Sequence, residues 1–437
     1  MVNVSSDELG GRYPVAMATT TTSVAESCAA AKKAVRALAS APTATKNAAL
    51  EATARLLEER AAEILDANAA DLADERAANL SEALRDRLTL SESRVAAMAE
   101  GVRVVAALED PVGEELEHRT LESGLDLRKV RVPLGVVAVV YEARPNVTID
   151  CAALTIKSGN AIVLRGSSYA ERSNAALAAI AREALEEAGL PADAVLPLSG
   201  GGHEELAELA TQEGLVDLLI PRGGGGLKNA IKAVATVPVM YAAAGNCHVF
   251  VHAEADLEMA RRIVVNAKTQ RPGVCNSAET LLVDEAIAPR FVPAILSDLA
   301  EAGVELVGDD RSRGLAGEAE ISAATEEDWD AEYLELKLAV GVVDSLESAI
   351  EHVNAHGTGH SEAIVTDSDS AAEAFVAGVD AAAVYVNAST RFTDGFEYGM
   401  GAEIGNSTQK LHARGPIGMR ELTTFKYVAR GDGQVRE

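Results

Sequence analysis

Three strongly apolar segments, each followed by a turn and a helix-forming stretch, most constrain the fold of this chain. They cover residues 135–146, 160–168 and 215–226, and a helix-forming stretch at 173–190 follows the second. Aliphatic residues without polar alternation are typical of strands buried on both faces of a parallel sheet. Their alternation with turns and helices predicts a doubly wound α/β domain over about residues 135–240.

A second set of apolar segments predicts another α/β unit over residues 241–405. Its expected strands are 248–252, 279–284, 338–344, 361–366 and 382–387, and its expected helices include 255–266 and 286–300.

The remaining segments have other patterns. Residues 24–108 are rich in Ala, Glu and Arg, and their apolar positions recur at helical spacing, which predicts several amphipathic helices. Segments 125–132 and 419–429 alternate apolar and polar residues and predict strands suited to pairing between subunits. Residues 1–23 show no periodicity and predict a loose tail.

The charge balance excludes two classes of partner. The chain has 437 residues, with 39 basic and 67 acidic side chains, hence a formal charge of −28. Such a charge repels the phosphates of nucleic acid and anionic membranes, so neither is expected as a partner. The acidic residues are spread evenly and arginine outnumbers lysine, as in a halophilic-type surface adapted to a salty cytoplasm.

The cysteines predict a reducing compartment. Cys28, Cys151, Cys247 and Cys275 lie far apart, and this does not suggest a disulfide scaffold. No apolar run is long enough to span a bilayer, and the N-terminus lacks the pattern of a signal peptide. We therefore expect a cytoplasmic protein.

Cys275 is the strongest chemical candidate. It follows a Pro-Gly turn in a loop, with Lys268 and Arg271 nearby in the sequence. Positive neighbours lower the pKa of a thiol and favour a nucleophile, whereas a buried apolar cysteine is the alternative interpretation. Glu279, four residues on, fits either a general base or a structural carboxylate.

Two other patterns are weaker. His352, His356 and His360 have helical spacing, but intervening glycines break that helix, so no metal site is expected. The glycines at 223–226 fit either a phosphate-binding loop or a packing turn, because they match neither standard nucleotide-binding motif.

Eight segments occur together in a characteristic order. They are YEARPNVT, IKSGNAIVLRGS, IPRGGGGL, GNCHVFV, NAKTQRPGVCNSAET, SEAIVT, VNASTRFTDG and GAEIGNSTQKLHARGPIGMREL. Over about residues 24–428 this set resembles the γ-glutamyl phosphate reductase family of the aldehyde dehydrogenase superfamily. The resemblance implies an aldehyde dehydrogenase-like α/β fold, with two doubly wound domains and a small β flap for oligomerisation.

The resemblance also implies a division of the chain. An NADPH-binding domain would comprise residues 24–117 and 134–240, and a catalytic domain residues 241–405. Residues 118–133 and 406–437 would mediate assembly into a homo-oligomer, a dimer or tetramer.

Site roles follow from the same resemblance, position by position. Cys275 matches the nucleophile, and Asn146 matches the asparagine that holds the oxyanion together with the backbone N–H of Cys275. The positions expected to bind the cofactor are Lys157, Arg165, Ser167, Pro221, Arg222, Gly223, Gly224 and Glu332. Arg144 and Arg391 are the expected substrate contacts, since guanidinium groups pair well with carboxylates.

The implied reaction is the second step of proline biosynthesis from glutamate. L-Glutamyl 5-phosphate, supplied by a separate glutamate 5-kinase, would be reduced by NADPH to L-glutamate 5-semialdehyde through a Cys275 thioacyl intermediate. Hydrolytic relatives carry a glutamate base about 30 residues before the cysteine, where this chain has Ala242. That difference argues against the alternative, an NAD-dependent dehydrogenase of free aldehydes. A non-catalytic scaffold is the other alternative.

Overall fold

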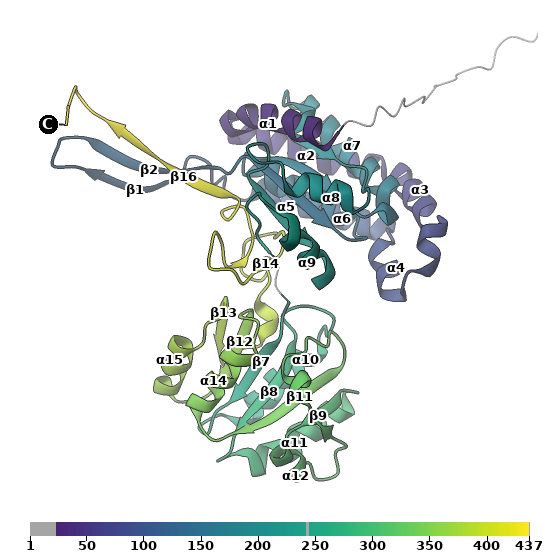
Figure 1. Cartoon of the computed structure of the whole chain (residues 1–437), viewed down its shortest axis with the longest axis vertical. Coiled ribbons are helices and arrows are strands. Elements are labelled where there is room, and N and C mark those ends of the chain that lie inside the picture. The colour runs from purple at the N-terminus through teal and green to yellow at the C-terminus, as the bar shows by residue number, and fades with distance from the viewer. Residues whose placement is uncertain (1–22, 242–243, 437) are drawn as a thin grey trace, which may run out of the picture.

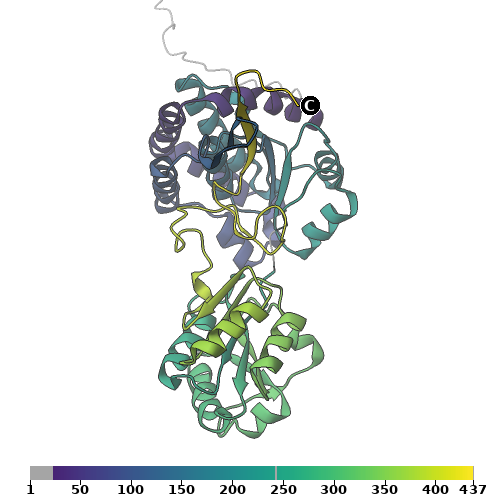
Figure 2. The ribbon, with the colours of Figure 1, turned by 90° about the vertical axis from the view of Figure 1, so that its left-hand side faces the viewer.

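The computed structural model describes residues 23–241 and 244–436. Apart from Ser23, the tail expected at residues 1–23 lies outside the described residues, and so does Ala242. Two α/β bodies lie one below the other, and a β arm projects from the upper body (Figure 1). A view from the side shows the same two bodies joined by thin connections (Figure 2).

The upper body is built on a four-stranded parallel sheet with the strand order β5-β4-β3-β6. Its strands are β3 Val136–Tyr141, β4 Ala161–Arg165, β5 Val195–Pro197 and β6 Leu218–Arg222. All six residues of β3 are buried, as the unbroken apolar run predicts. The chain proceeds from β3 through β4 to β5 and then returns to the opposite side of β3.

Helices surround this sheet. The N-terminal helices are α1 Val24–Ser40, α2 Thr43–Glu59, α3 Ala61–Leu72, α4 Glu82–Leu88 and α5 Glu92–Ala107, with a 3₁₀ turn η1 at Glu75–Asn79. The later ones are α6 Asn146–Lys157, α7 Glu171–Glu187, α8 His203–Ala210 and α9 Gly225–Val234, with 3₁₀ turns η2 Ser168–Ala170 and η3 Ala192–Ala194. The several amphipathic helices expected before residue 108 are confirmed.

The lower body has a seven-stranded parallel sheet with the order β10-β9-β11-β8-β7-β12-β13. Its strands are β7 Cys247–Val251, β8 Ala278–Asp284, β9 Glu305–Gly308, β10 Ser322–Ala323, β11 Lys337–Val343, β12 Ser361–Val365 and β13 Ala383–Val386. Its helices are α10 Leu257–Thr269, α11 Ala288–Glu301, α12 Asp310–Gly314, α13 Glu326–Trp329, α14 Leu346–His356 and α15 Asp369–Gly378, with a 3₁₀ turn η4 at Thr390–Phe392.

Each face of the lower sheet has its own core. In β7, Val249 and Val251 belong to one apolar cluster, and Phe250 between them belongs to another. Successive side chains of a strand point to opposite faces, so the sheet is covered on both sides. This arrangement confirms the predicted doubly wound α/β class.

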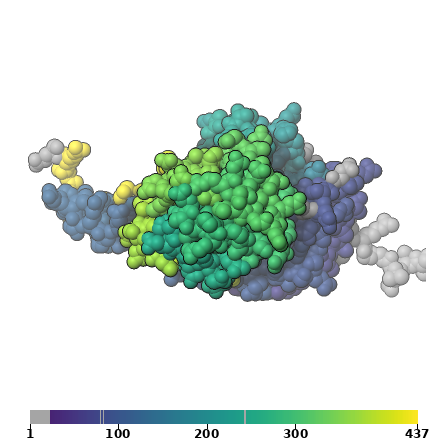
Figure 3. Space-filling model, turned by 90° about the horizontal axis from the view of Figure 1, so that it is seen from below, coloured from purple at the N-terminus to yellow at the C-terminus, as the bar shows by residue number. Residues whose placement is uncertain are grey.

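The arm is a three-stranded antiparallel sheet with the order β1-β2-β16. Its strands are β1 Glu115–Thr120, β2 Asp126–Pro133 and β16 Thr423–Arg430. A separate short antiparallel pair, β14 Asn406–Ser407 and β15 Gly415–Pro416, precedes β16 in the sequence. The two alternating segments, which were expected to pair between subunits, thus pair with each other within one chain. The arm extends well beyond the rest of the molecule (Figure 3).

No helix among the described residues is long and apolar enough to cross a membrane. The four cysteines are unpaired.

Candidate active site

The order of the upper sheet determines where a ligand can bind. The connections that leave β3 and β6 run in opposite directions across the sheet, so the carboxyl ends of these strands flank a crevice. Arg144 and Asn146 follow β3, and Arg222 ends β6. Cys275 precedes β8, and its loop faces this crevice from the lower body.

A cavity of about 470 Å³ occupies this position. Arg144, Asn146 and Arg222 line it from the upper body, and Arg271, Gly273 and Val274 line it from the loop that carries Cys275. The structure therefore brings together residues that are more than 100 positions apart in the sequence.

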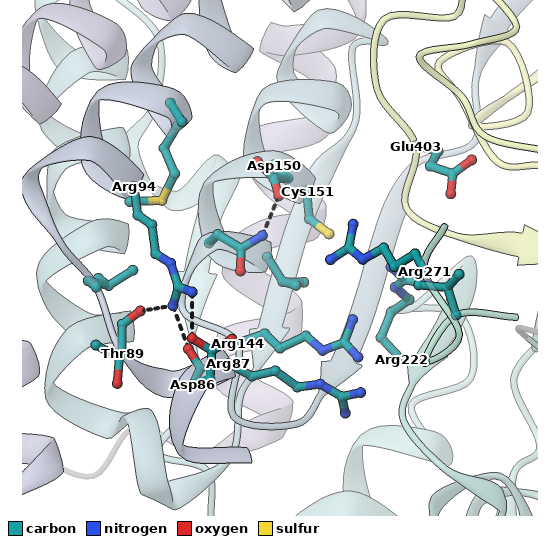
Figure 4. Close-up of a pocket in the computed structure, with 17 residues that line it drawn as sticks. Asp86, Arg87, Thr89, Arg94, Arg144, Asp150, Cys151, Arg222, Arg271 and Glu403 are labelled. Atoms are coloured by element: carbon teal, nitrogen blue, oxygen red, sulfur yellow. Dashed lines mark hydrogen bonds and ion pairs between the residues drawn. The ribbon is translucent and has the colours of Figure 1, made fainter. Parts of the chain in front are cut away.

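Arginines dominate the wall of this cavity. Arg87 and Arg144 extend toward the side that holds Arg222 and Arg271 (Figure 4). Burial lowers the pKa of Arg144 to about 10, and the charges of Arg87 and Arg222 lower it further. Cations that repel one another in a partly buried space gain free energy when an anion enters, so the cavity fits a multiply charged anionic ligand.

Cys275 is half-buried beside the cavity. Burial raises the pKa of its thiol to about 11, Arg222 opposes the rise, and Glu332 and Glu403 add to it. The cation that most favours the thiolate is therefore Arg222, for which the sequence indicated a cofactor role, and not Lys268 or Arg271. Gly245 packs directly on the backbone of Cys275, where any side chain would collide with its carbonyl oxygen.

Lys268 is engaged elsewhere. Its side chain is fully buried, and its Nζ lies 2.6 Å from Oε2 of Glu279, which is also fully buried. Burial raises the pKa of Glu279 to about 7. The structural interpretation of Glu279 therefore fits better than a base acting on Cys275.

Asn146 begins α6 and lines the cavity. Its Nδ2 donates to Oδ2 of Asp150 at 2.9 Å, which fixes the amide and leaves one amide hydrogen for another acceptor. Burial raises the pKa of Asp150 to about 6. This arrangement can present a hydrogen-bond donor to an oxyanion at the cavity.

Arg165 is the last residue of β4, and Ser167 follows just beyond the end of this strand. The Arg165 guanidinium donates to the carbonyls of Gly201 and Gly202 and pairs with Glu205 at 3.3 Å. Burial lowers the pKa of Arg165, and Ser167 caps the following 3₁₀ turn.

The glycine-rich loop joins β6 to α9. Pro221 is in β6, Gly223 and Gly224 follow it, and Gly224 donates its N–H to Glu142. Open space surrounds the Cα atoms of Gly225 and Gly226 at the start of α9. The free N–H groups of a first helical turn bind phosphate, so this loop fits a dinucleotide.

The structure bears on two of the residues expected to bind the cofactor. Lys157 is the last residue of α6, and its side chain is fully buried. Its ammonium donates to Asn47 Oδ1 at 2.6 Å and to the Ala106 carbonyl at 2.7 Å. A cation held in this way serves the helix packing and does not reach a cofactor cleft. Arg222 lines the cavity beside Cys275 and acts on its thiol, so its guanidinium fits a substrate anion better than a cofactor phosphate.

Glu332 and Arg391 both lie near Cys275. Glu332 accepts the Gly245 N–H at 2.7 Å, and burial raises its pKa. Arg391 donates to Gln270 Oε1 at 2.9 Å, burial lowers its pKa, and the charge of Cys275 acts on it. Both positions fit roles at the reacting centre.

The sequence reasoning assigned no role to Arg87, Asp150 or Glu403, all of which line the cavity. Glu403 lies in one of the segments that carry the family resemblance, and this position could have marked it as a candidate site residue. Arg87 lies on α4, and no motif marks it. Of the three histidines, His352 and His356 lie side by side on α14, with ring centroids 4.5 Å apart. His360 lies beyond the end of this helix and bonds Ser361.

Comparisons with known proteins agree with this geometry. Residues 8–324 match the model of the aldehyde dehydrogenase family. The chain is 54% identical over 407 residues to a gamma-glutamyl phosphate reductase of Moorella thermoacetica, covering 93% of this chain and 97% of that one. It is also 54% identical over 356 residues to a protein of the same name from Thermobifida fusca, covering 82% and 85%.

A solved structure supports the same assignment. The crystal structure of gamma-glutamyl phosphate reductase from Thermotoga maritima superposes with a TM-score of 0.92 at 46% identity, covering 95% of this chain and 100% of that one. This likeness confirms the predicted aldehyde dehydrogenase-like fold. The chain belongs to the γ-glutamyl phosphate reductases of the aldehyde dehydrogenase family.

Proposed function

We propose that this chain reduces L-glutamyl 5-phosphate to L-glutamate 5-semialdehyde with NADPH and releases phosphate, as the second step of proline biosynthesis from glutamate. The observation that carries the proposal is the arginine-lined cavity next to Cys275. An acyl phosphate with an α-carboxylate brings two anionic groups to this cavity, whereas a simple aldehyde brings none.

The residues have distinct tasks in this reaction. The sulfur of Cys275 attacks the acyl carbon, and the bond from that carbon to the phosphate oxygen breaks, which leaves a thioester on Cys275. Asn146 and the backbone N–H of Cys275 hold the oxyanion that develops during attack. Arg222 favours the thiolate and, with Arg144, binds the phosphate as it leaves. Arg391 binds the α-carboxylate.

The glycine-rich loop and the first turn of α9 would hold the phosphates of NADPH, with Arg165 and Ser167 at the adenosine end and Glu332 at the nicotinamide ribose. NADPH, when bound, supplies the hydride that reduces the thioester to the aldehyde. Arg165 supports NADPH over NADH because a guanidinium pairs well with a 2′-phosphate.

The wider setting is part of the same proposal. Residues 24–117 and 134–240 form the cofactor domain, residues 241–405 the catalytic domain, and the arm joins subunits of a homo-oligomer. The exposed edge strands β1 and β16 offer unpaired backbone groups for that contact. A separate glutamate 5-kinase supplies the substrate in the cytoplasm.

The reverse reaction tests the proposal. The purified protein should reduce NADP⁺ with glutamate 5-semialdehyde only when inorganic phosphate is present, and more slowly with NAD⁺. Reduction that proceeds equally without phosphate would instead show a hydrolytic aldehyde dehydrogenase.

A further inference from the structure

Three acidic side chains line the cavity, and two of them have partners. Asp86 pairs with Arg94 at 2.7 Å, and Asp150 accepts the amide of Asn146. Among the described residues, no lysine or arginine nitrogen lies within 4.0 Å of the Glu403 carboxylate. Glu403 therefore brings a carboxylate without a paired cation to a cavity that is lined by several arginines.

The carboxylate of Glu403 is held in place by neutral donors. Its Oε2 accepts the backbone N–H of Gly395 at 2.8 Å, and its Oε1 accepts Nδ2 of Asn406 at 3.2 Å. Each oxygen keeps a further lone pair. The group is thus oriented by the segment between β13 and β14, with acceptor capacity left over.

The charged groups that face Glu403 are Asp394, Arg222 and Cys275. The pKa of Glu403 is raised to about 7, mainly by burial and also by the charge of Asp394, while Arg222 opposes the rise. A buried carboxylate without a paired cation is costly, so a ligand that supplies a cation gains free energy there. Figure 4 shows Glu403 beyond Arg222 and Arg271, on the side of the C-terminal segment.

We propose that Glu403 binds the α-ammonium group of the substrate and thereby makes the cavity selective for a 2-amino acid. This inference rests on the proposed function, which leaves the contact to the amino group unassigned. Glutamyl phosphate carries a phosphate, an α-carboxylate and an α-ammonium. The arginine wall matches the two anionic groups, and Glu403 supplies the complementary charge for the third.

The test compares two aldehydes in the reverse assay with NADP⁺ and phosphate. These are glutamate 5-semialdehyde and 5-oxopentanoate, which lacks only the amino group. We expect the wild-type enzyme to prefer the amino substrate about 10- to 100-fold in kcat/KM, as for a charge-assisted hydrogen bond. Glu403→Gln should reduce this preference to about threefold or less, through a higher KM for the semialdehyde, whereas kcat/KM for 5-oxopentanoate should not fall, because the loss of the Glu403 charge favours the Cys275 thiolate.

Three further variants separate a binding role from a structural one. Glu403→Asp keeps the charge and should retain part of the preference. Glu397→Gln removes an exposed carboxylate on the same segment and should leave kcat/KM for both substrates unchanged. Asp150→Asn should slow both substrates by the same factor. An equal loss for both substrates in Glu403→Gln would overturn the inference.

A pH series gives a second readout. The preference for the amino substrate should fall as the pH drops from about 8 to 6, because Glu403 then binds a proton and loses its charge. The ratio of the two substrates cancels the titration of Cys275, which affects both. A preference that stays constant over this range contradicts the role of Glu403.

Protection of Cys275 from iodoacetamide separates this inference from the proposed function. Glutamate should protect the wild-type thiol more strongly than glutarate, and Glu403→Gln should abolish the difference. This comparison needs no turnover. If neither aldehyde is oxidised but glutamate protects the thiol better than glutarate, the proposed function fails and the inference stands. Equal protection by glutamate and glutarate overturns the inference.

Discussion

The side-chain amide of Asn146 donates to the carboxylate of Asp150 one helical turn further along α6, at 2.9 Å. Both residues line the cavity next to the Cys275 loop. The bond uses one amide hydrogen and orients the other, so Asp150 acts as a positioning residue for Asn146. The proposed oxyanion donor is therefore held in place before the substrate arrives, which is how such donors contribute most to rate.

Asn146→Ala should lower kcat about 10²- to 10³-fold, because it removes one of the two donors to the oxyanion. KM should change little, since the donor acts mainly when charge develops. Steady-state kinetics of the reverse reaction measure both values. A loss of less than tenfold would remove Asn146 from this role.

Cys275→Ala should abolish turnover, since the thioester cannot form without the sulfur. The side chain is small and half-buried, so the cooperative thermal transition should persist. Incubation with substrate should label the wild-type chain with a hydroxylamine-sensitive acyl group, detected by mass spectrometry, and leave the variant unlabelled. Turnover by the variant would end the assignment of the nucleophile.

Arg222→Gln should raise the pKa of the Cys275 thiol above its present value of about 11, because it removes the cation that favours the thiolate. The thiolate fraction at pH 8 then falls, and alkylation by iodoacetamide should slow about three- to tenfold. Arg87→Gln is the control, since Arg87 lines the same cavity without a resolved effect on this thiol. Equal rates in Arg222→Gln and the wild type would contradict the electrostatic role.

Glu279→Gln should lower the free energy of unfolding by about 3–5 kcal/mol, because it leaves the buried Lys268 ammonium without its counter-charge. Urea unfolding followed by circular dichroism measures the change. The double variant Lys268→Met with Glu279→Gln should recover much of the loss. If the single variant is as stable as the wild type, the pair carries no such charge.

The formal charge of −28 predicts a salt effect on stability. At about 3 M KCl the repulsion between surface carboxylates is screened over about 2 Å, so the thermal midpoint should rise above that measured at 0.1 M KCl, where the screening length is about 10 Å. Differential scanning calorimetry measures both midpoints. A lower midpoint at high salt would rule out the halophilic interpretation.

Local patterns were sufficient for most secondary-structure elements. The apolar run of β3 and the helical spacing before residue 108 depend on side chains within one segment, so the sequence predicts them directly. The polar strand β1 was missed because its residues do not alternate between apolar and polar; pairing with β2 determines its conformation.

The sequence by itself determined the α/β class and the family, and it indicated the cysteine that we propose as the nucleophile, because apolar periodicity and ordered motifs are properties of contiguous residues. Only the tertiary structure decided which charges meet. It buries Lys157 between helices, pairs Lys268 with Glu279, and turns Arg222 toward Cys275. It also brings Glu403 to a cavity whose other walls come from residues 86–274. Electrostatic partners depend on distance in space, and the crossover connections of the two sheets set that distance.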